Sequence, residues 1–418
     1  MKSFLLISTL VFSLPTFGQH RDLNVTVSNK WNQPKTDEPV TISLSEIKKL
    51  DFAVKSAIVT LNGEEIPCQL DDFDGDFCAD ELVFLTNSGA KEVQKFNITL
   101  KANEQQKKYP SRVYADMMLD DKKGKHPFIT SIEAPGESYI YSDLYHHGAA
   151  FESELTAFRV YFDHRQNIDI YGKKLYRLEL KDTHFYTTPE QMKQDYGNDV
   201  LWAGNSIGCG SFKNWNGKSP ENMTDVRLRG QRIIAAGPLR TVVEVKDMGW
   251  RKKNADAISK DKSNNADTSV LNMRQYYILY GGHRECEVRI CFDSVLGEET
   301  FCTGVQKIGS EPQGFTKDNG IAASWGSDYP EMGKKEIFPP ETVGLAVYVP
   351  EEFIKEQHTD ELNYLFVIGA KGKKQMKYYV TFCADKEEKG YHSVNEWFNS
   401  LDSWRSSLMN PVEIKTSF

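Results

Sequence analysis

Short runs in which hydrophobic and polar residues alternate dominate the chain from residue 20 onward. Within residues 19–105 they include LNVTVS, PVTISL, SAIVTLNG, ELVFLT and KFNITLKA, with turn residues between them. Alternation with a period of two is typical of β-strands that bury one face. The pattern predicts a small N-terminal β-sandwich domain over residues 19–105, which a polar, proline-containing segment separates from the rest.

Residues 106–418 continue with longer runs of the same kind, among them FRVYF, LRTVVEVKDM, RQYYILY, CEVRICF, VGLAVYV and KYYVTFC. A segment of about 300 residues is too long for an immunoglobulin-like sandwich of about 100 residues. We therefore expect a large antiparallel β-supersandwich in this part of the chain. The predicted fold class is mainly β, with two domains.

One helix is predicted near the C-terminus, in the segment SVNEWFNSLDSWRSSL. Ser393 followed by Glu396 is the pattern of a capping box at a helix start, and Pro411 follows the segment. The apolar residues fall on one helical stripe, which predicts packing against a sheet. This stripe consists of Val394, Trp397, Phe398, Leu401, Trp404 and Leu408.

Residues 1–18 have the composition of a secretory signal peptide. Lys2 is a positive n-region, residues 4–14 are an apolar h-region, and small residues precede position 19. We therefore expect cleavage after residue 18 and export of the protein. No later run approaches the roughly 20 apolar residues that a transmembrane helix needs. The net charge of -8 argues against a nucleic-acid partner, because a phosphate backbone requires a concentrated basic surface.

The segment QLDDFDGDFCADELVF places several carboxylates around one turn. Carboxylate oxygens at alternate positions of a tight loop can bind calcium, although the spacing is not that of an EF-hand. The alternative is an ordinary β-hairpin, because Asp-Gly is a preferred two-residue turn. A structural calcium ion is thus one of two interpretations, and no other cofactor is expected. The carboxylates concerned are Asp72, Asp74, Asp76 and Asp80.

The segment YHHGAAFESELTAFRVYFDHRQNIDIYGKK, residues 145–174, concentrates ionisable residues where strands are expected. A histidine can transfer a proton near neutral pH, and a glycosidase requires two carboxylates. A group of tyrosine, histidine and arginine would instead suit β-elimination on a uronic acid, because arginine pairs with the sugar carboxylate. We assign His147 as the acid or base, with Glu152 or Glu154 as its carboxylate partner.

Arg159 is assigned to binding a substrate carboxylate, and Tyr161 to assisting proton transfer. If residues 151–163 are extended, however, Glu152 and Glu154 lie on one face of the strand, and Arg159 and Tyr161 lie on the other. A β-bulge would bring the two groups together. Otherwise one of the two groups is structural, as in an arginine–glutamate network between strands.

Three further residues are candidates for substrate binding. Trp202 and Asn205 lie in a glycine-rich loop, and such loops allow a ligand to approach the backbone closely. Trp325, in the segment SWGSD, could stack on a sugar ring. The alternative is an ordinary turn for the loop with Trp202 and Asn205, and a place in the core for Trp325.

Four segments resemble the family catalogued as domain of unknown function 4861. In chain order they are HHGAAFESELTAFRVYFDHRQNIDIYGKK, DVLWAGNSIGCGSFKNWNGK, GPLRTVVEVKDMGW and GIAASWGSD. The resemblance implies a periplasmic protein of glycan-degrading bacteria, encoded among glycosidases and polysaccharide lyases for pectin-like uronic acid polymers. It also implies a supersandwich similar to galactose-mutarotase-like domains. It implies no particular reaction.

These observations lead to three hypotheses about function. The first is an exported hydrolase or lyase that acts on oligosaccharides containing uronic acid. The second is an isomerase of the mutarotase kind, and the third is a non-catalytic glycan-binding protein. The sugar, the linkage, the oligomeric state and any metal ligands are left open.

Overall fold

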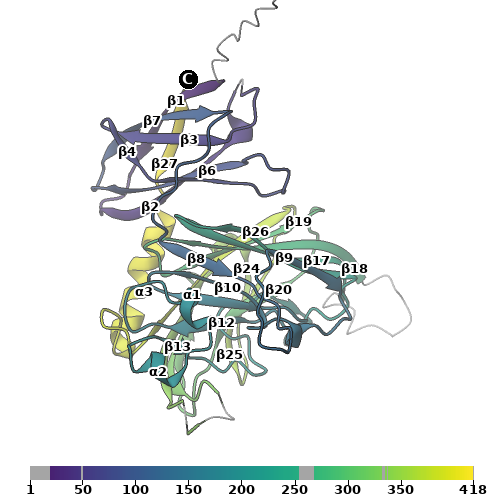
Figure 1. Ribbon diagram of the computed structural model, residues 1–418. Helices are drawn as coiled ribbons and strands as arrows, with labels where there is room; N and C mark the ends of the chain where they lie inside the picture. Colours follow the sequence, from purple (N-terminus) through teal and green to yellow (C-terminus); the bar gives the residue numbers. More distant parts are fainter. Residues whose placement is uncertain (1–18, 49, 254–267, 332–334, 337, 418) are drawn as a thin grey trace, which may run out of the picture.

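The computed structural model describes residues 19–48, 50–253, 268–331, 335–336 and 338–417, so the predicted signal peptide at residues 1–18 lies outside the described residues (Figure 1). The fold is mainly β, with several antiparallel sheets and one long C-terminal helix, as predicted. In the described part of the chain, no helix is both long and apolar enough to cross a membrane.

The smaller sandwich consists of a five-stranded sheet in the order β27-β1-β7-β3-β4 and a three-stranded sheet in the order β2-β6-β5. Apolar residues that alternate along these strands, such as Val25, Val40, Phe84 and Phe96, are fully buried between the two sheets. The bounds are β1 (His20–Ser28), β2 (Lys35–Ser43), β3 (Ser56–Leu61), β4 (Glu64–Ile66), β5 (Cys68–Asp71), β6 (Glu81–Ser88), β7 (Val93–Lys101) and β27 (Glu413–Ser417).

The strand β27 comes from the far end of the chain. It pairs antiparallel with β1, so that Asn24 lies opposite Ser417, and Figure 1 shows it in yellow among the purple strands of the smaller sandwich. Its side chains are exposed and it has only five residues, so no hydrophobic pattern predicts this strand from the sequence. The C-terminal residues thus complete a sheet that is otherwise built from residues 20–101.

The larger part is a supersandwich of a nine-stranded sheet and two five-stranded sheets around one continuous core. The nine-stranded sheet has the order β21-β22-β23-β26-β19-β18-β17-β16-β9, and the others have the orders β13-β12-β11-β10-β8 and β15-β14-β20-β25-β24. The strands that come first in the sequence of this part are β8 (Val113–Asp116), β9 (Ser131–Pro135), β10 (Gly148–Ser153), β11 (Ala157–Tyr161), β12 (Ile168–Gly172), β13 (Asn198–Asp199), β14 (Lys213–Trp215), β15 (Pro220–Glu221) and β16 (Leu228–Ala236).

The remaining strands and the helices follow in chain order. They are β17 (Arg240–Lys253), β18 (Thr268–Tyr280), β19 (Cys286–Phe292), β20 (Phe301–Gln306), β21 (Gln313–Thr316), β22 (Ile321–Asp328), β23 (Glu341–Tyr348), β24 (Ile354–Thr359), β25 (Asn363–Ile368), β26 (Gln375–Ala384), α1 (Leu180–Thr183), α2 (Pro189–Met192) and α3 (Val394–Met409). Short 3₁₀ turns lie at Leu44–Glu46, Tyr141–Asp143 and Glu351–Phe353.

The helix α3 packs on β22 and β23 through its predicted apolar stripe. Trp397 is buried against Gly344, where a Cβ atom would come within 2.7 Å of the indole ring. Ser393 accepts the backbone N–H of Glu396, but the Glu396 carboxylate accepts from His392 and not from Ser393, so only half of the predicted capping box forms. Trp325 is 7% exposed in the same cluster, so the assignment of Trp325 as a sugar platform is wrong.

Candidate functional site

A cavity of about 500 Å³ opens beside the end of β11. Strand alternation explains its floor, because Arg159 and Tyr161 lie two residues apart and share one face, while Phe158 and Val160 point into the core. Loops on either side supply the remaining walls. Other lining residues that bear on its chemistry are Tyr141, His147, Arg165, Tyr186, Asp199 and Trp202.

His147 stands at the bend that precedes β10, and its backbone is left-handed, with φ +67°. Gly148 follows with φ +157°, and a Cβ atom there would lie 1.9 Å from the carbonyl oxygen of Val160. The imidazole stacks on the Tyr141 ring with centroids 3.9 Å apart and an interplanar angle of 12°. Its Nδ1 is 3.1 Å from the Tyr141 carbonyl oxygen. A carbonyl only accepts, so Nδ1 carries the hydrogen and Nε2 keeps a lone pair.

Burial lowers the pKa of His147 to about 4, and the positive charge of Arg159 acts in the same direction. The imidazole is therefore neutral at physiological pH. A neutral imidazole with an unprotonated Nε2 in a cavity has the form of a general base.

Arg159 is 2% exposed and is the centre of the cavity's charge network. Its guanidinium pairs with Asp169 and lies 3.1 Å from a carboxylate oxygen of Asp199. It also donates to the hydroxyls of Tyr161 and Tyr186, at 3.1 and 3.3 Å. Arg159 therefore holds together two strands and two tyrosines, and it contributes positive charge at the cavity wall.

The two tyrosines differ in where their hydroxyl hydrogens point. Tyr161 donates to Asp169 at 2.6 Å, so its proton is already engaged. Tyr186 accepts from Arg159, and among the described residues no acceptor is found for its own hydrogen. Burial raises the pKa of Tyr186 to about 12, so the hydroxyl stays protonated. Tyr186 can therefore donate a proton to a ligand, a role that the sequence analysis assigned to Tyr161.

Asp199, on β13, and Glu331 both line the cavity, and Asp199 is the one that contacts Arg159. Burial and the nearby charge of Asp169 raise its pKa well above the usual range, although Arg159 opposes the shift. Its side chain is 29% exposed, so it can reach a ligand. Asp199 thus holds a proton more readily than an unperturbed aspartate does.

Arg165 brings a second positive charge to the cavity. Its Nε lies 2.7 Å from a carboxylate oxygen of Asp163, and its Cζ is 4.9 Å from the Tyr141 ring centroid. The side chain is about one third exposed. Because a guanidinium carries more donors than one carboxylate oxygen uses, Arg165 can bind a ligand carboxylate more readily than the buried Arg159 can.

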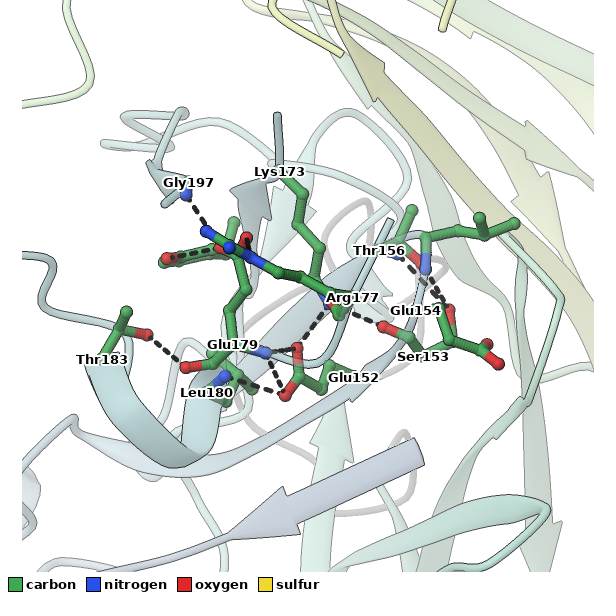
Figure 2. A network of polar contacts seen from close by, with 12 residues as sticks. Glu152, Ser153, Glu154, Thr156, Lys173, Arg177, Glu179, Leu180, Thr183 and Gly197 are labelled. Carbon is green, nitrogen blue, oxygen red and sulfur yellow. Dashed lines mark hydrogen bonds and ion pairs between the residues drawn. The ribbon is translucent and has the colours of Figure 1, made fainter. Parts of the chain in front are cut away.

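Glu152 does not lie in this cavity, and its assignment as a catalytic carboxylate is wrong. It is fully buried near the C-terminal end of β10, where it pairs with Lys173. Its oxygens also accept the backbone N–H groups of Glu179 and Leu180 at 2.8–2.9 Å, at the start of α1 (Figure 2). The carboxylate anchors a short helix and satisfies a buried lysine.

Glu154 is likewise structural. One of its oxygens accepts from Arg112 at 2.6 Å, and the other accepts the backbone N–H of Gly282 at 2.7 Å. It lies after the end of β10, and Figure 2 shows its carboxylate pointing away from that of Glu152.

Residues 151–163 do not form one extended strand, because β10 and β11 form a hairpin in which Glu152 lies opposite Ala157 and Ala150 lies opposite Arg159. Opposite residues share a face of the sheet, so the expectation that Glu152 lies on the other face from Arg159 and Tyr161 is wrong. Glu152 is instead separated from the cavity along the strands, because it lies near the turn of the hairpin.

Four of the eight predicted site residues line the cavity, namely His147, Arg159, Tyr161 and Trp202. Trp202 is 52% exposed, as a stacking platform requires. Asn205 is not among the lining residues. Three lining residues were not predicted from the sequence: Tyr141 lies in a 3₁₀ turn, Tyr186 lies in a loop, and Asp199 lies on the two-residue strand β13, which is too short to show a periodic pattern. Arg165 stands beside the predicted strand and is the one missed residue with a local signal, its spacing of two from Asp163.

In the acidic hairpin, carboxylate oxygens of Asp72, Asp74 and Asp80 lie within 4.8 Å of one another. The same carboxylates accept backbone N–H groups within the turn, for example from Gly75 to Asp72 at 2.6 Å and from Phe73 to Asp80 at 2.6 Å. These bonds stabilise the turn whether or not an ion binds. The structural calcium ion therefore stays a prediction.

Comparisons with known proteins identify the family and distant structural neighbours. A family model described as Domain of unknown function (DUF4861) matches residues 27–414. No curated protein matches the sequence. One similar solved structure is a protein in the glycosyl hydrolase family 38 from Enterococcus faecalis, with 9% identity, a TM-score of 0.45, and coverage of 95% of this chain and 47% of the other.

Another is an alpha-mannosidase from Enterococcus faecalis V583, with 8% identity, a TM-score of 0.44, and coverage of 95% of this chain and 46% of the other. This chain thus spans about half the length of the two matched chains.

Proposed function

The chain belongs to the DUF4861 family, and we propose that it is a carbohydrate-active enzyme that performs β-elimination on an oligosaccharide containing uronic acid. One observation carries this proposal: a neutral histidine, whose Nε2 has no partner among the described residues, lies in one cavity with two arginines and three tyrosines. The His147 ring centroid is 6.3 Å from those of both Tyr161 and Tyr186. These are the groups that abstraction of a proton next to a carboxylate requires.

In the proposed reaction, the Nε2 of His147 takes the proton from C5 of the uronic acid, next to its carboxylate. The electron pair forms a double bond between C4 and C5, and the bond between C4 and its oxygen breaks. The hydroxyl of Tyr186 gives its proton to that oxygen. Arg165 binds the sugar carboxylate, and Arg159 behind it stabilises the negative charge that develops there.

A second candidate, a glycoside hydrolase, is favoured by Asp199. A carboxyl group whose pKa is raised, in the same cavity as His147, could protonate a glycosidic oxygen while His147 activates water. This candidate needs no uronic acid. The two reactions are distinguished by their products, because only elimination leaves a carbon–carbon double bond in the sugar.

The test is incubation of the purified protein with oligosaccharides of uronic acids and of neutral sugars. Elimination predicts an ultraviolet absorbance from the conjugated carboxylate, on uronic acid substrates only. New reducing ends without that absorbance would support hydrolysis. Neither signal, with binding detected by calorimetry, would overturn both reactions and support a glycan-binding protein.

The two tyrosines provide a test of the proposed roles. Tyr186→Phe removes the proton donor, so we expect kcat to fall by about 10²-fold or more. Tyr161→Phe removes a hydroxyl whose hydrogen bonds Asp169, so we expect a smaller loss. Equal and small losses in both variants would exclude Tyr186 as the acid.

Residues 1–18 lie outside the described residues, so export remains part of the proposal. The predicted signal peptide would bring the protein into the periplasm, where oligosaccharides from extracellular glycans arrive. Secretion from a bacterial host with and without residues 2–18 tests this expectation.

A further inference from the structure

Behind the cavity lies a buried cluster that the proposed reaction does not use. Asp116, at the end of β8, is 3% exposed and lies between two histidines. One of its oxygens is 2.9 Å from Nε2 of His146, and the other is 3.1 Å from Nδ1 of His184. The hydroxyl of Tyr114 donates to the latter oxygen at 3.2 Å. Both oxygens of one carboxylate are therefore engaged by side chains from separate segments.

Each of these histidines directly precedes a residue of the cavity wall. His146 precedes His147, the proposed base, and is itself 0% exposed. His184 precedes Phe185, whose ring packs on Arg159, and Tyr186, which is the proposed proton donor. A single carboxylate thus joins the segment that carries the base to the segment that carries the acid.

Both segments contain backbone that few residues adopt. His147 has φ +67°, His184 has φ +45° and Phe185 has φ +69°. Left-handed backbone at such residues costs free energy and persists only where surrounding contacts hold it. α1, which ends at Thr183, is a single turn and provides little support of its own.

Arg159 holds the same two segments from the cavity side. Its guanidinium lies 3.5 Å from the carbonyl oxygen of His146, 3.3 Å from the Tyr186 hydroxyl, and 4.1 Å from the Phe185 ring centroid. The base and the acid are therefore fixed from two sides, by Arg159 in front and by Asp116 behind.

We propose that Asp116 is a positioning residue, whose carboxylate sets the distance between His147 and Tyr186 through His146 and His184. The proposal rests on the proposed function for the roles of His147 and Tyr186, but the alignment itself does not depend on any reaction. A misplacement of catalytic groups by about 1 Å can reduce a rate by about 10²-fold. Loss of this carboxylate therefore affects turnover more than substrate binding.

The first test is Asp116→Asn, which keeps the shape of the side chain but replaces one accepting oxygen by an N–H donor. We expect kcat to fall by about 10²-fold, with KM within about threefold of the wild type. The NMR signal of His147 in protein labelled at histidine should shift as well, and this readout needs no substrate.

Asp71→Asn is the matched control. Asp71 lies on β5 of the smaller sandwich, is as buried as Asp116, and accepts hydrogen bonds from Gln69 and from Arg240 of the larger sandwich. This substitution should lower stability and leave the His147 signal unchanged. An unchanged His147 signal and an unchanged kcat in Asp116→Asn would overturn the proposal.

A second pair of variants decides the matter if Asp116→Asn does not fold. His184→Asn and His184→Asp have the same shape, and both residues tolerate left-handed backbone. Only asparagine can donate to Asp116, whereas an aspartate repels it. We expect His184→Asn to keep the His147 signal and most of kcat, and His184→Asp to lose both. Equal behaviour of the two variants would overturn the proposal.

These experiments can support or overturn the role of Asp116 independently of the proposed function. If the wild type turns over no sugar, but the His147 signal shifts in Asp116→Asn and His184→Asp only, then the alignment stands and the proposed reaction fails. If the wild type is an active lyase and the signal and kcat do not respond, then the reaction stands and the role of Asp116 fails.

Discussion

At residue 147 the backbone and the side chain impose different demands. The left-handed backbone restricts the choice to a few residue types, and the stacked, hydrogen-bonded ring requires a planar group with a donor on its near side. Histidine meets both demands and leaves a basic nitrogen toward the cavity. The position is therefore specific in a way that a surface histidine is not.

We predict that His147→Asn gives a folded but inactive protein. Asparagine tolerates φ +67° and can donate to the Tyr141 carbonyl oxygen, but it offers no base. The loss of a general base should reduce kcat by about 10²- to 10⁴-fold. Circular dichroism should show an unchanged fold, and calorimetry should show retained binding of the sugar. Activity within about tenfold of the wild type would exclude His147 as the base.

The pKa of His147 makes the pH dependence a second prediction. A base with a pKa of about 4 is unprotonated above that pH, so kcat/KM should rise through about pH 4 and then level off. An unperturbed histidine would instead give a rise near pH 6.5. A pH–rate profile measures the difference, and in His147→Asn the residual activity should lack this limb.

The same shift has a consequence for stability. In the unfolded chain His147 binds a proton near pH 6.5, and in the folded protein it does so only near 4. Between these values the unfolded state binds more protons, so the contribution of His147 to stability is complete above about pH 6.5 and decreases as the pH falls toward 4.

At the scale of elements, the alternation along β10 and β11 explains both what could be predicted and what could not. Period two places Arg159 and Tyr161 together, and the structure agrees. The same alternation, continued through residues 151–163, wrongly places Glu152 on the opposite face, because the turn between β10 and β11 reverses the chain and puts Glu152 opposite Ala157. The partners of the glutamates could not be predicted, because Lys173 and Arg112 meet them through tertiary packing. Tyr186 lies in a loop and Asp199 on a strand of two residues, so no periodic pattern assigns either to the cavity.

We predict that Glu152→Gln lowers stability without affecting turnover. The change leaves the ammonium group of Lys173 buried without its carboxylate, which should cost about 3–5 kcal/mol in the free energy of unfolding. Urea denaturation measures this cost. Glu104→Gln breaks an ion pair whose glutamate is 62% exposed, and it should change little. A Glu152→Gln protein that is stable but has lost its turnover would instead indicate that Glu152 takes part in the reaction.

At the scale of the whole molecule, Arg240 connects the two sandwiches. It extends from β17 of the larger one and is 0% exposed. Its guanidinium lies 2.7 Å from Asp71 and 2.6 Å from Glu81, both on strands of the smaller sandwich. The periodicity of the strands in each sandwich allows that sandwich to be predicted from its own sequence. An arginine in a hydrophobic strand, however, gives no indication of a partner about 160 residues away, because such a pair depends on how the two sandwiches pack together.

We predict that Arg240→Met destabilises the protein by about 3–5 kcal/mol, because it leaves the buried carboxylate of Asp71 without its partner. Loss of this contact should also separate the unfolding of the two sandwiches, and calorimetry would show this as a second transition. Arg251→Met is the control, since Arg251 is 65% exposed in a loose pair with Asp225. A variant of Arg240 with unchanged unfolding would show that the contact between sandwiches depends on other residues.

The pairing of β27 with β1 has a consequence for biosynthesis. β1 leaves the ribosome long before its neighbour at residues 413–417, which is translated nearly four hundred residues later. Until then one side of β1 exposes unpaired backbone N–H and C=O groups, which other chains can bind. The nascent protein therefore has an open strand edge from the synthesis of β1 until residues 413–417 emerge, and we expect a chaperone that protects this edge to improve the yield.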